Sequence, residues 1–372
     1  MLHSPLAPYL YWAKTRPAAE FDLAGSNLLA CTLDELPGAG EAVDLMAPDR
    51  GGYPALVQAI AAHYGVTTDR VVTASGCSAA NFLAIAALVG PGDRVLMEAP
   101  WYDQITGACR LLGAKVDTFE RRFEEGYRVD VETVRARLTP ATKLVIITSP
   151  HNPSGQATDR ETLVALQAMA EEVGVPVLVD EVYLDATNLL RHGPSSAPTT
   201  GPRAAGHYPR AALVGDRLLS ISSLTKSYGL GGLRCGWIIA SPKVAERARR
   251  VRDLIDNIGA APADRLGALA FSQLDRIAAR AQKLVSANLD LTRTFLARHP
   301  ELEVAVPLEA TITFPRLVGV ADTDPFVARL LTEHGVAVAA GRFFGAPGHI
   351  RISLGGRTDS LAAGLERIGR LL

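Results

Sequence analysis

The sequence has few cysteines, no excess of either charge and no long apolar run. Its four cysteines, Cys31, Cys77, Cys109 and Cys235, lack the paired spacing of a zinc site or a disulfide framework, which indicates reduced thiols. No stretch of about 18 apolar residues is present to span a bilayer, and the first residues lack a charged region followed by an apolar one. These absences predict an untargeted cytoplasmic protein without a membrane partner.

The charge balance also argues against nucleic acid as a partner. Lysine and arginine number 38 against 39 aspartates and glutamates, so the net charge is −1. This gives no basic footprint for nucleic acid. With 372 residues, 48% of them hydrophobic, the chain is long enough for two domains with a substantial core.

Short β-prone segments alternate with segments of helical periodicity over most of the chain. We expect strands at residues 71–73, 94–98, 115–119, 143–148, 175–179, 218–221 and 236–240, and helices at 54–64, 78–89, 102–112, 131–138, 159–172 and 242–255. This alternation predicts an α/β fold in which a mostly parallel sheet is covered by helices on both faces.

The remaining segments suggest a second domain. The first forty-odd residues contain four prolines that prevent a long helix, and residues 188–209 have the composition of a surface excursion. Residues 263–299 are compatible with nearly continuous helix, and short strands and two helices follow up to the end of the chain. We therefore predict an N-terminal arm (1–45), a large domain (46–275) and a smaller C-terminal α+β domain (276–372), which the arm joins.

One segment has the chemistry of a site. A β-prone run at 218–221 leads into small hydroxyl residues, Lys226 and four glycines between positions 229 and 236, with Arg234 among them. A lysine buried at a strand end can lose its proton and become a nucleophilic amine. The hydroxyl of Ser223 and the guanidinium of Arg234 are donors that a phosphate requires. A lysine and a phosphate cradle in one turn suggest pyridoxal 5′-phosphate (PLP).

Two other interpretations fit the same residues. Ser223-Leu-Thr-Lys226 matches the S-x-x-K motif of serine β-lactamases, but the accompanying Ser-Asp-Asn and Lys-Thr-Gly tripeptides occur nowhere in the chain. A glycine-rich surface loop with a solvated lysine is the other interpretation. The choice depends on the rest of the sequence.

Further candidates follow other predicted strands, where ligands bind in open parallel sheets. In Ser-Gly-Cys-Ser (75–78), the amides of Gly76, Cys77 and Ser78 would lie at a helix N-terminus, either as a phosphate site or as a plain turn. In Pro-Trp-Tyr (100–102), the aromatic rings could stack on a planar ligand or belong to the core.

Two more strand ends carry polar side chains. Asn152 stands between His151 and Pro153 in a loop that could be a generic turn or could present the amide as a hydrogen-bond donor. Asp180 ends a wholly apolar strand, where a carboxylate is costly unless a cation meets it. A protonated pyridine nitrogen would serve, and would make the ring an electron sink. Mg²⁺ is the alternative, but no second acidic cluster or P-loop supports it.

Together these motifs resemble PLP-dependent enzymes of fold type I, specifically the class I/II aminotransferases related to aspartate aminotransferase. The resemblance runs from about residue 47 to the end and rests on motifs in matching order: Ser-Gly-Cys-Ser (75–78), Pro-x-Tyr (100–102), Asn-Pro-Ser-Gly (152–155), Asp-x-x-Tyr (180–183), Ser-x-x-Lys (223–226), Arg234 and Ile-Arg-Ile-Ser (350–353). It implies a homodimer that exchanges an amino group between an amino acid and a 2-oxo acid by a ping-pong mechanism.

The resemblance also implies a role for each residue. Lys226 would form the aldimine and move the proton, Asp180 would pair with the pyridine nitrogen, and Arg351 would hold the substrate carboxylate. The resemblance further implies that Asn152 and Tyr183 contact the phenolic oxygen and that Tyr102, or in its place Trp101, stacks on the ring. Around the phosphate it implies Gly76, Cys77, Ser78, Ser223 and Arg234.

The sequence departs from the family at two places. Ala47 stands near the position of a tyrosine that usually reaches the partner subunit's phosphate, and Ala-Gly-Ser-Asn (24–27) replaces a glycine-containing substrate loop. A different substrate pocket follows. Arg50, His151 and Arg342 are candidates for contacting the substrate side chain.

Other functions on the same fold remain open. The motifs do not determine which bond at Cα breaks, so a lyase, decarboxylase, oxidase or γ-replacement enzyme is the alternative. A PLP-binding regulatory protein would need a DNA-binding segment, and the chain has neither a helix-turn-helix signature nor a basic patch.

Overall fold

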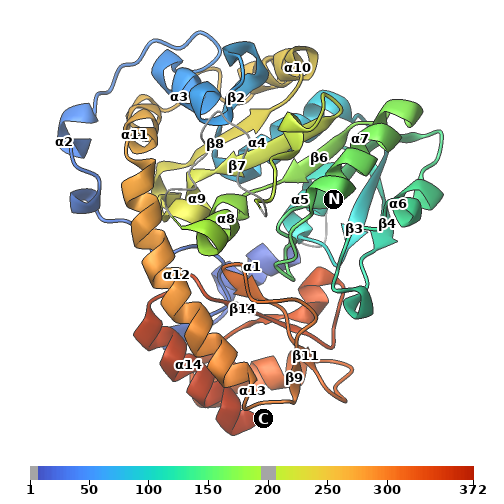
Figure 1. Ribbon diagram of the computed structural model, residues 1–372, viewed down its shortest axis with the longest axis vertical. Helices are drawn as coiled ribbons and strands as arrows, with labels where there is room; N and C mark the ends of the chain where they lie inside the picture. Colours follow the sequence, from blue (N-terminus) through green and yellow to red (C-terminus); the bar gives the residue numbers. More distant parts are fainter. Residues whose placement is uncertain (1–6, 194–206) are drawn as a thin grey trace.

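The computed structural model, which describes residues 7–193 and 207–372, is built around a seven-stranded sheet (Figure 1). In spatial order the strands are β2 (Val71–Ser75), β8 (Cys235–Ile239), β7 (Leu218–Ser223), β6 (Val177–Asp180), β5 (Thr142–Thr148), β3 (Arg94–Ala99) and β4 (Lys115–Glu120). All neighbours are parallel except β8, which is antiparallel to both β2 and β7. The predicted mostly parallel sheet is confirmed.

Side chains of the apolar strands pack in two hydrophobic cores, because successive side chains on a strand point to opposite faces of the sheet. On β5, Ile146 packs in the core that includes side chains of α4 (Gly76–Leu88), α5 (Asp103–Leu111) and α10 (Pro242–Asp253). Its neighbour Ile147 packs in the core shared with α6 (Val131–Arg137) and α7 (Arg160–Val173). The helices therefore cover both faces, as the sequence predicts. A further core joins α3 (Pro54–Tyr64) and α11 (Ala261–Phe271) to the β2 and β8 end of the sheet.

Helix α12 (Leu274–Leu296) runs from the large sheet down to a group of small sheets (Figure 1). One small sheet contains β10 (Ile312–Thr313), β14 (Ile350–Ser353) and β13 (Ala339–Ala340); the others pair β1 (Phe21–Asp22) with β12 (Val336–Ala337), and β9 (Leu302–Glu303) with β11 (Arg316–Leu317). Their core takes in side chains of α1 (Pro8–Thr15), α13 (Asp324–His334) and α14 (Thr358–Leu371). The N-terminal segment thus belongs to the same core as the last strands.

Three helices lie in segments for which the sequence predicts no long helix: α1, α2 (Ala39–Ala42) and α8 (Leu184–His192). Helix α8 extends into the predicted excursion at 188–209, because Leu189 is buried and the Asn188 side chain bonds the backbone of Tyr208; the rest of that prediction, 194–206, lies outside the described residues. Helix α1 forms because Pro8 occupies its first turn, where proline is tolerated. The predicted long helix at 263–299 is interrupted at Ser272 and Gln273, between α11 and α12.

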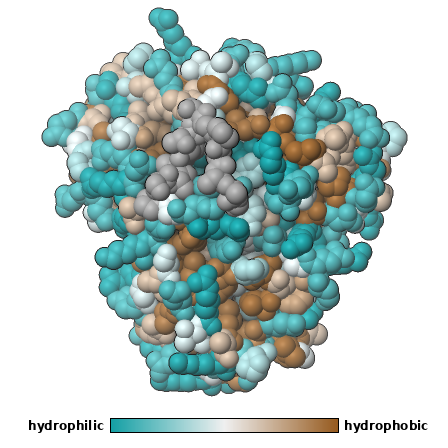
Figure 2. All heavy atoms as spheres, in the orientation of Figure 1, coloured by the Kyte–Doolittle hydropathy of each residue, from teal (hydrophilic) through white to brown (hydrophobic). Residues whose placement is uncertain are grey.

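Figure 2 shows a largely hydrophilic face with smaller apolar clusters in brown. Across residues 7–193 and 207–372, every helix is too short or too polar to cross a membrane. The four cysteines are all free, as their spacing predicts.

Candidate active site

The carboxyl ends of the parallel strands open into one cavity of about 200 Å³. Of the residues predicted from sequence, nine line it: Cys77, Ser78, Tyr102, Asn152, Asp180, Tyr183, Ser223, Lys226 and Arg234. Gly76 and Arg351 lie directly behind lining residues. The structure thus brings the strand-end residues together, as expected for an open parallel sheet.

Lys226 lies on α9 (Leu224–Tyr228), a short helix that begins directly after β7, with the Ser223 hydroxyl accepting the Thr225 amide at its start. Its Nζ donates to Ser26 Oγ at 2.9 Å and to Asn27 Oδ1 at 2.6 Å. Burial, and then the positive charge of Arg351, lowers the pKa of Lys226 to about 7. A substantial fraction of the amine is therefore unprotonated and nucleophilic near neutral pH.

Asp180 ends β6 and is almost completely buried. Its carboxylate accepts hydrogen bonds from Asn81 Nδ2 at 2.7 Å, from the Val182 amide at 3.1 Å, and from the Cys77 thiol. Burial raises the pKa of Asp180, and these donors only partly oppose it. A cation placed against this carboxylate would favour its charged form, and a protonated pyridine nitrogen is such a cation.

The candidate phosphate site lies where β2 passes into α4. Gly76 has φ +84°, and a Cβ there would overlap the guanidinium of Arg234. Arg234 itself has φ +51° and donates from Nη2 to the Ser75 carbonyl at 3.2 Å. The Cys77 and Ser78 amides lie in the first turn of α4, a favourable place for an anion. Donor chemistry and close packing both fit a phosphate group.

Arg351 lies on β14 with its side chain fully buried. It donates to Asn152 Oδ1 at 2.9 Å, to the Tyr9 hydroxyl at 2.6 Å and to the Ala24 carbonyl at 2.9 Å. The guanidinium is stacked between the Tyr9 and Phe344 rings. The guanidinium is buried and held in one orientation, and its paired N–H donors suit a carboxylate.

Two tyrosines complete the cavity wall. Burial raises the pKa of Tyr183 to about 12, although a hydrogen bond with Ser26 opposes the shift. Burial raises the pKa of Tyr102 well above its ordinary value. Both therefore remain protonated hydroxyls at neutral pH. Tyr102 and Val182 both line the cavity, and each offers an apolar surface to a flat ring.

The sequence alone missed four polar groups of the site: Tyr9, Ser26, Asn27 and Asn81. Tyr9 and Ser26 come from the N-terminal segment and reach Arg351 and Lys226 across the fold. Asn81 lies one turn after Cys77 on α4, so the helical spacing from the glycine turn was the available signal. The contact of Tyr9 leaves no local signal in the sequence, whereas Ser26 and Asn27 belong to the segment 24–27 that the resemblance places at the substrate loop.

None of the three candidates for the substrate side chain lines this cavity. His151 is fully buried, with Nε2 donating to the Pro100 carbonyl at 2.9 Å and Nδ1 bonded to Ser154 at 2.7 Å. Burial lowers its pKa, so it is neutral. Arg342 pairs with Asp324 at 2.5 Å beside a separate groove, and Arg50 lines another. Within this chain, none of the three reaches the cavity, so their contact with a substrate side chain stays a prediction.

Comparison with known proteins identifies the family. The model of the family described as "Aminotransferase class I and II" matches residues 34–368. The chain belongs to the class I and II aminotransferases. These enzymes use PLP, so the match confirms the predicted fold type, cofactor and reaction class.

Individual relatives extend the match over nearly the whole chain. Capreomycidine synthase of Streptomyces vinaceus is 31% identical, with 99% of this chain and 94% of the relative covered. An aspartate aminotransferase of Streptomyces avermitilis is 30% identical, with 87% and 80% covered. The crystal structure of a PLP-dependent aminotransferase from Streptococcus suis is 26% identical with a TM-score of 0.87, covering 100% of this chain and 98% of that one.

Proposed function

We propose that this class I and II aminotransferase exchanges an amino group between an amino acid and a 2-oxo acid in the cavity around Lys226, and that it acts as a homodimer. The single observation that carries the proposal is the Lys226 amine, whose pKa is about 7, in one cavity with Asp180 and Arg234. The division into an arm, a large domain and a small domain at residues 45 and 275 remains part of this proposal.

The cofactor would lie between the phosphate cradle and Asp180. Gly76, Cys77, Ser78, Ser223 and Arg234 would hold the phosphate, and Asp180 would face the ring nitrogen. Tyr102 would cover the ring, and Asn152 and Tyr183 would bond its phenolic oxygen. When bound, PLP supplies an electron sink for the electrons of a broken Cα bond.

The chain's own groups would orient the substrate and move the proton. Arg351 would bind the α-carboxylate through its fork of N–H donors. The neutral amine of Lys226 would accept the Cα proton as a general base and later return it. The hydrogen bonds from Nζ to Ser26 and Asn27 support this role, because they would keep the freed amine at one place beside the ring.

A different reaction at Cα is the second candidate. It is favoured by one observation: a relative that matches 99% of this chain is named a synthase rather than an aminotransferase. The residues around the cavity do not distinguish the two reactions, since both begin at the same lysine and cofactor.

The test is an absorbance spectrum of the holoenzyme before and after adding each standard amino acid, ornithine and related diamino acids, without an oxo acid. Loss of the visible cofactor band with formation of pyridoxamine phosphate is expected, and it would identify the donor. Ammonia release or a long-lived new band would favour the second candidate.

Lys226→Ala gives the matching loss-of-function control. We expect it to abolish the lysine-linked visible band and to lower turnover by several orders of magnitude, because it removes both the nucleophile and the base. A visible band of wild-type intensity in the variant would contradict the assignment of Lys226.

A further inference from the structure

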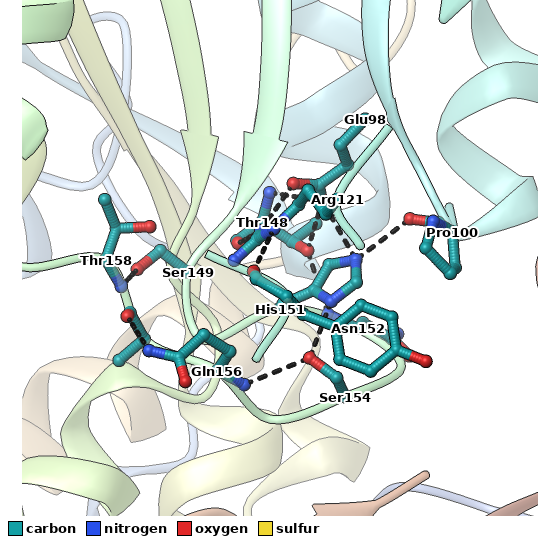
Figure 3. Close-up of polar contacts among 12 residues, drawn as sticks. Glu98, Pro100, Arg121, Thr148, Ser149, His151, Asn152, Ser154, Gln156 and Thr158 are labelled. Carbon is teal, nitrogen blue, oxygen red and sulfur yellow. Dashed lines mark hydrogen bonds and ion pairs between the residues drawn. The ribbon is translucent and has the colours of Figure 1, made fainter. Parts of the chain in front are cut away.

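A buried ion pair lies directly beside the Asn152 loop (Figure 3). Glu98, near the end of β3, accepts from Arg121, just after β4, at 2.7 Å, and both side chains are 0% exposed. Removing two charges from water is costly, and apolar residues of similar volume would often be equally stable in their place. Stability alone therefore does not explain why charged residues occupy these positions.

The contacts of Glu98 lead toward the active site. Its Oε1 accepts the Thr148 hydroxyl at 2.6 Å and the Thr148 amide at 2.7 Å. The same hydroxyl accepts the Asn152 amide at 2.9 Å. The backbone N–H of Asn152 is the donor in its bond to the Thr148 hydroxyl oxygen. The hydroxyl hydrogen of Thr148 is therefore free to point to Glu98. The carboxylate thus fixes the orientation of the hydroxyl that holds the Asn152 backbone.

Asn152 continues this chain of hydrogen bonds to Arg351. Its side-chain oxygen accepts from Arg351 Nη1 at 2.9 Å, and both residues are buried. Arg121 braces the other end, donating to the Tyr127 carbonyl at 2.6 Å and the Thr148 carbonyl at 3.3 Å. Hydrogen bonds on both sides of Asn152, one to its backbone amide and one to its side-chain oxygen, therefore join the ion pair to Arg351, the residue proposed to bind the carboxylate.

We propose that Glu98 and Arg121 are positioning residues that hold Thr148 and the Asn152 loop, and through them orient Arg351 for the substrate carboxylate. This inference rests on the proposed function, because it assumes that Arg351 and Asn152 contact substrate and cofactor. The pair contacts neither ligand itself. It sets the geometry of the groups that do.

The first test is Thr148→Val, which keeps the shape of the side chain and removes the hydroxyl. We expect KM for the amino donor to rise about three- to tenfold, the equivalent of one net hydrogen bond, with a smaller change in kcat. The pH midpoint of the cofactor's visible band should also shift, since Asn152 moves. Thr148→Ser restores the hydroxyl and should recover most of the lost affinity.

The second test replaces the pair itself by Glu98→Leu with Arg121→Met. This double variant avoids a lone buried charge, and we expect the same rise in KM and the same shift in midpoint. Combined with Thr148→Val it should add little, because all three changes break one path. Val134→Ala, in the apolar core under α6, is the control for a general loss of stability.

The outcomes separate the inference from the proposed function. If Thr148→Val and the double variant lower the thermal midpoint as Val134→Ala does but leave KM and the spectral midpoint unchanged, the pair is merely structural and the inference is wrong. Arg351→Lys tests the assumption beneath it. If that variant leaves KM unchanged, the carboxylate site is assigned wrongly and the inference falls, whereas the proposed function is decided separately by the absorbance test and by Lys226→Ala.

Discussion

At the scale of single residues, the decisive property is the charge state of Lys226. Its pKa is about 7 because the side chain is buried and Arg351 adds positive charge nearby. An ordinary surface lysine would be protonated at neutral pH and could not attack a carbonyl group. The fold therefore produces the nucleophile by desolvation and by the placement of one arginine.

This property predicts a pH profile. In apoenzyme mixed with PLP, the rate of covalent attachment should rise with pH up to about 7 and then level off, because only the neutral amine reacts. Arg351→Met removes a positive charge and should move the profile to higher pH. Stopped-flow absorbance at a series of pH values measures both, and a wild-type rate that still rises at pH 9 would contradict the lowered pKa.

The sequence could predict that side chains lie in one cavity where each of them follows a strand. Lys226, Asp180 and Asn152 could be found because an apolar run ends at or just before each of them. Tyr9 could not, since it meets Arg351 across 342 positions of sequence. The sequence also could not show that both ring nitrogens of His151 make hydrogen bonds within the protein, to Ser154 and to the Pro100 carbonyl.

At the scale of elements, the site depends on how closely α4 and β8 approach each other. Gly236 on β8 lies against the Gly76 backbone so tightly that a Cβ on either residue would overlap its neighbours. Arg234 precedes β8 and reaches the start of α4. The phosphate cradle is thus a property of two elements and not of one loop.

Gly76→Ala should therefore weaken PLP binding at least tenfold, because the new methyl group displaces the Arg234 guanidinium. Gly92→Ala is a matched control: its φ is +85°, nearly the same, but no atom lies within 4 Å of the added Cβ. Both variants should lose about 1 kcal/mol of stability from backbone strain. Equilibrium titration with PLP separates them, and equal affinities would show that the close approach is unimportant.

Sequence patterns predicted most of the elements but not their pairing. The βα alternation was visible because each strand is a short apolar run and each helix has an apolar stripe. The antiparallel direction of β8 was not, since the same apolar pattern serves either direction. Helix α8 was not predicted, because the polar and proline-rich composition of residues 188–209 outweighed the single buried Leu189 near the beginning of that segment.

At the scale of the whole molecule, exposed apolar residues lie a few positions in sequence from the two partners of one ion pair, Asp49 and Arg252. Leu45 and Met46 are 83% and 75% exposed, and Leu254 is 87% exposed. Asp49 links the two segments by its ion pair with Arg252 at 3.0 Å. Large apolar side chains grouped on a surface are typical of a protein interface.

We expect this surface to form the homodimer. Sedimentation should give twice the 39.5 kDa chain mass, and Leu254→Arg should shift the equilibrium toward monomer by placing a charge in the contact. Val164→Arg, at an exposed apolar position on α7, should leave the dimer intact. A wild-type protein that sediments as a monomer at micromolar concentration would refute this assignment.

The distribution of the site along the chain also has a consequence for biosynthesis. The proposed cofactor contacts lie between residues 76 and 234, and all of them follow strands of the large sheet or belong to it. The carboxylate site needs Tyr9, Ala24 and Arg351, from opposite ends of the chain. As the ribosome releases the polypeptide, every proposed cofactor contact emerges more than a hundred residues before Arg351. The proposed coenzyme contacts are therefore synthesised before the proposed substrate site is complete.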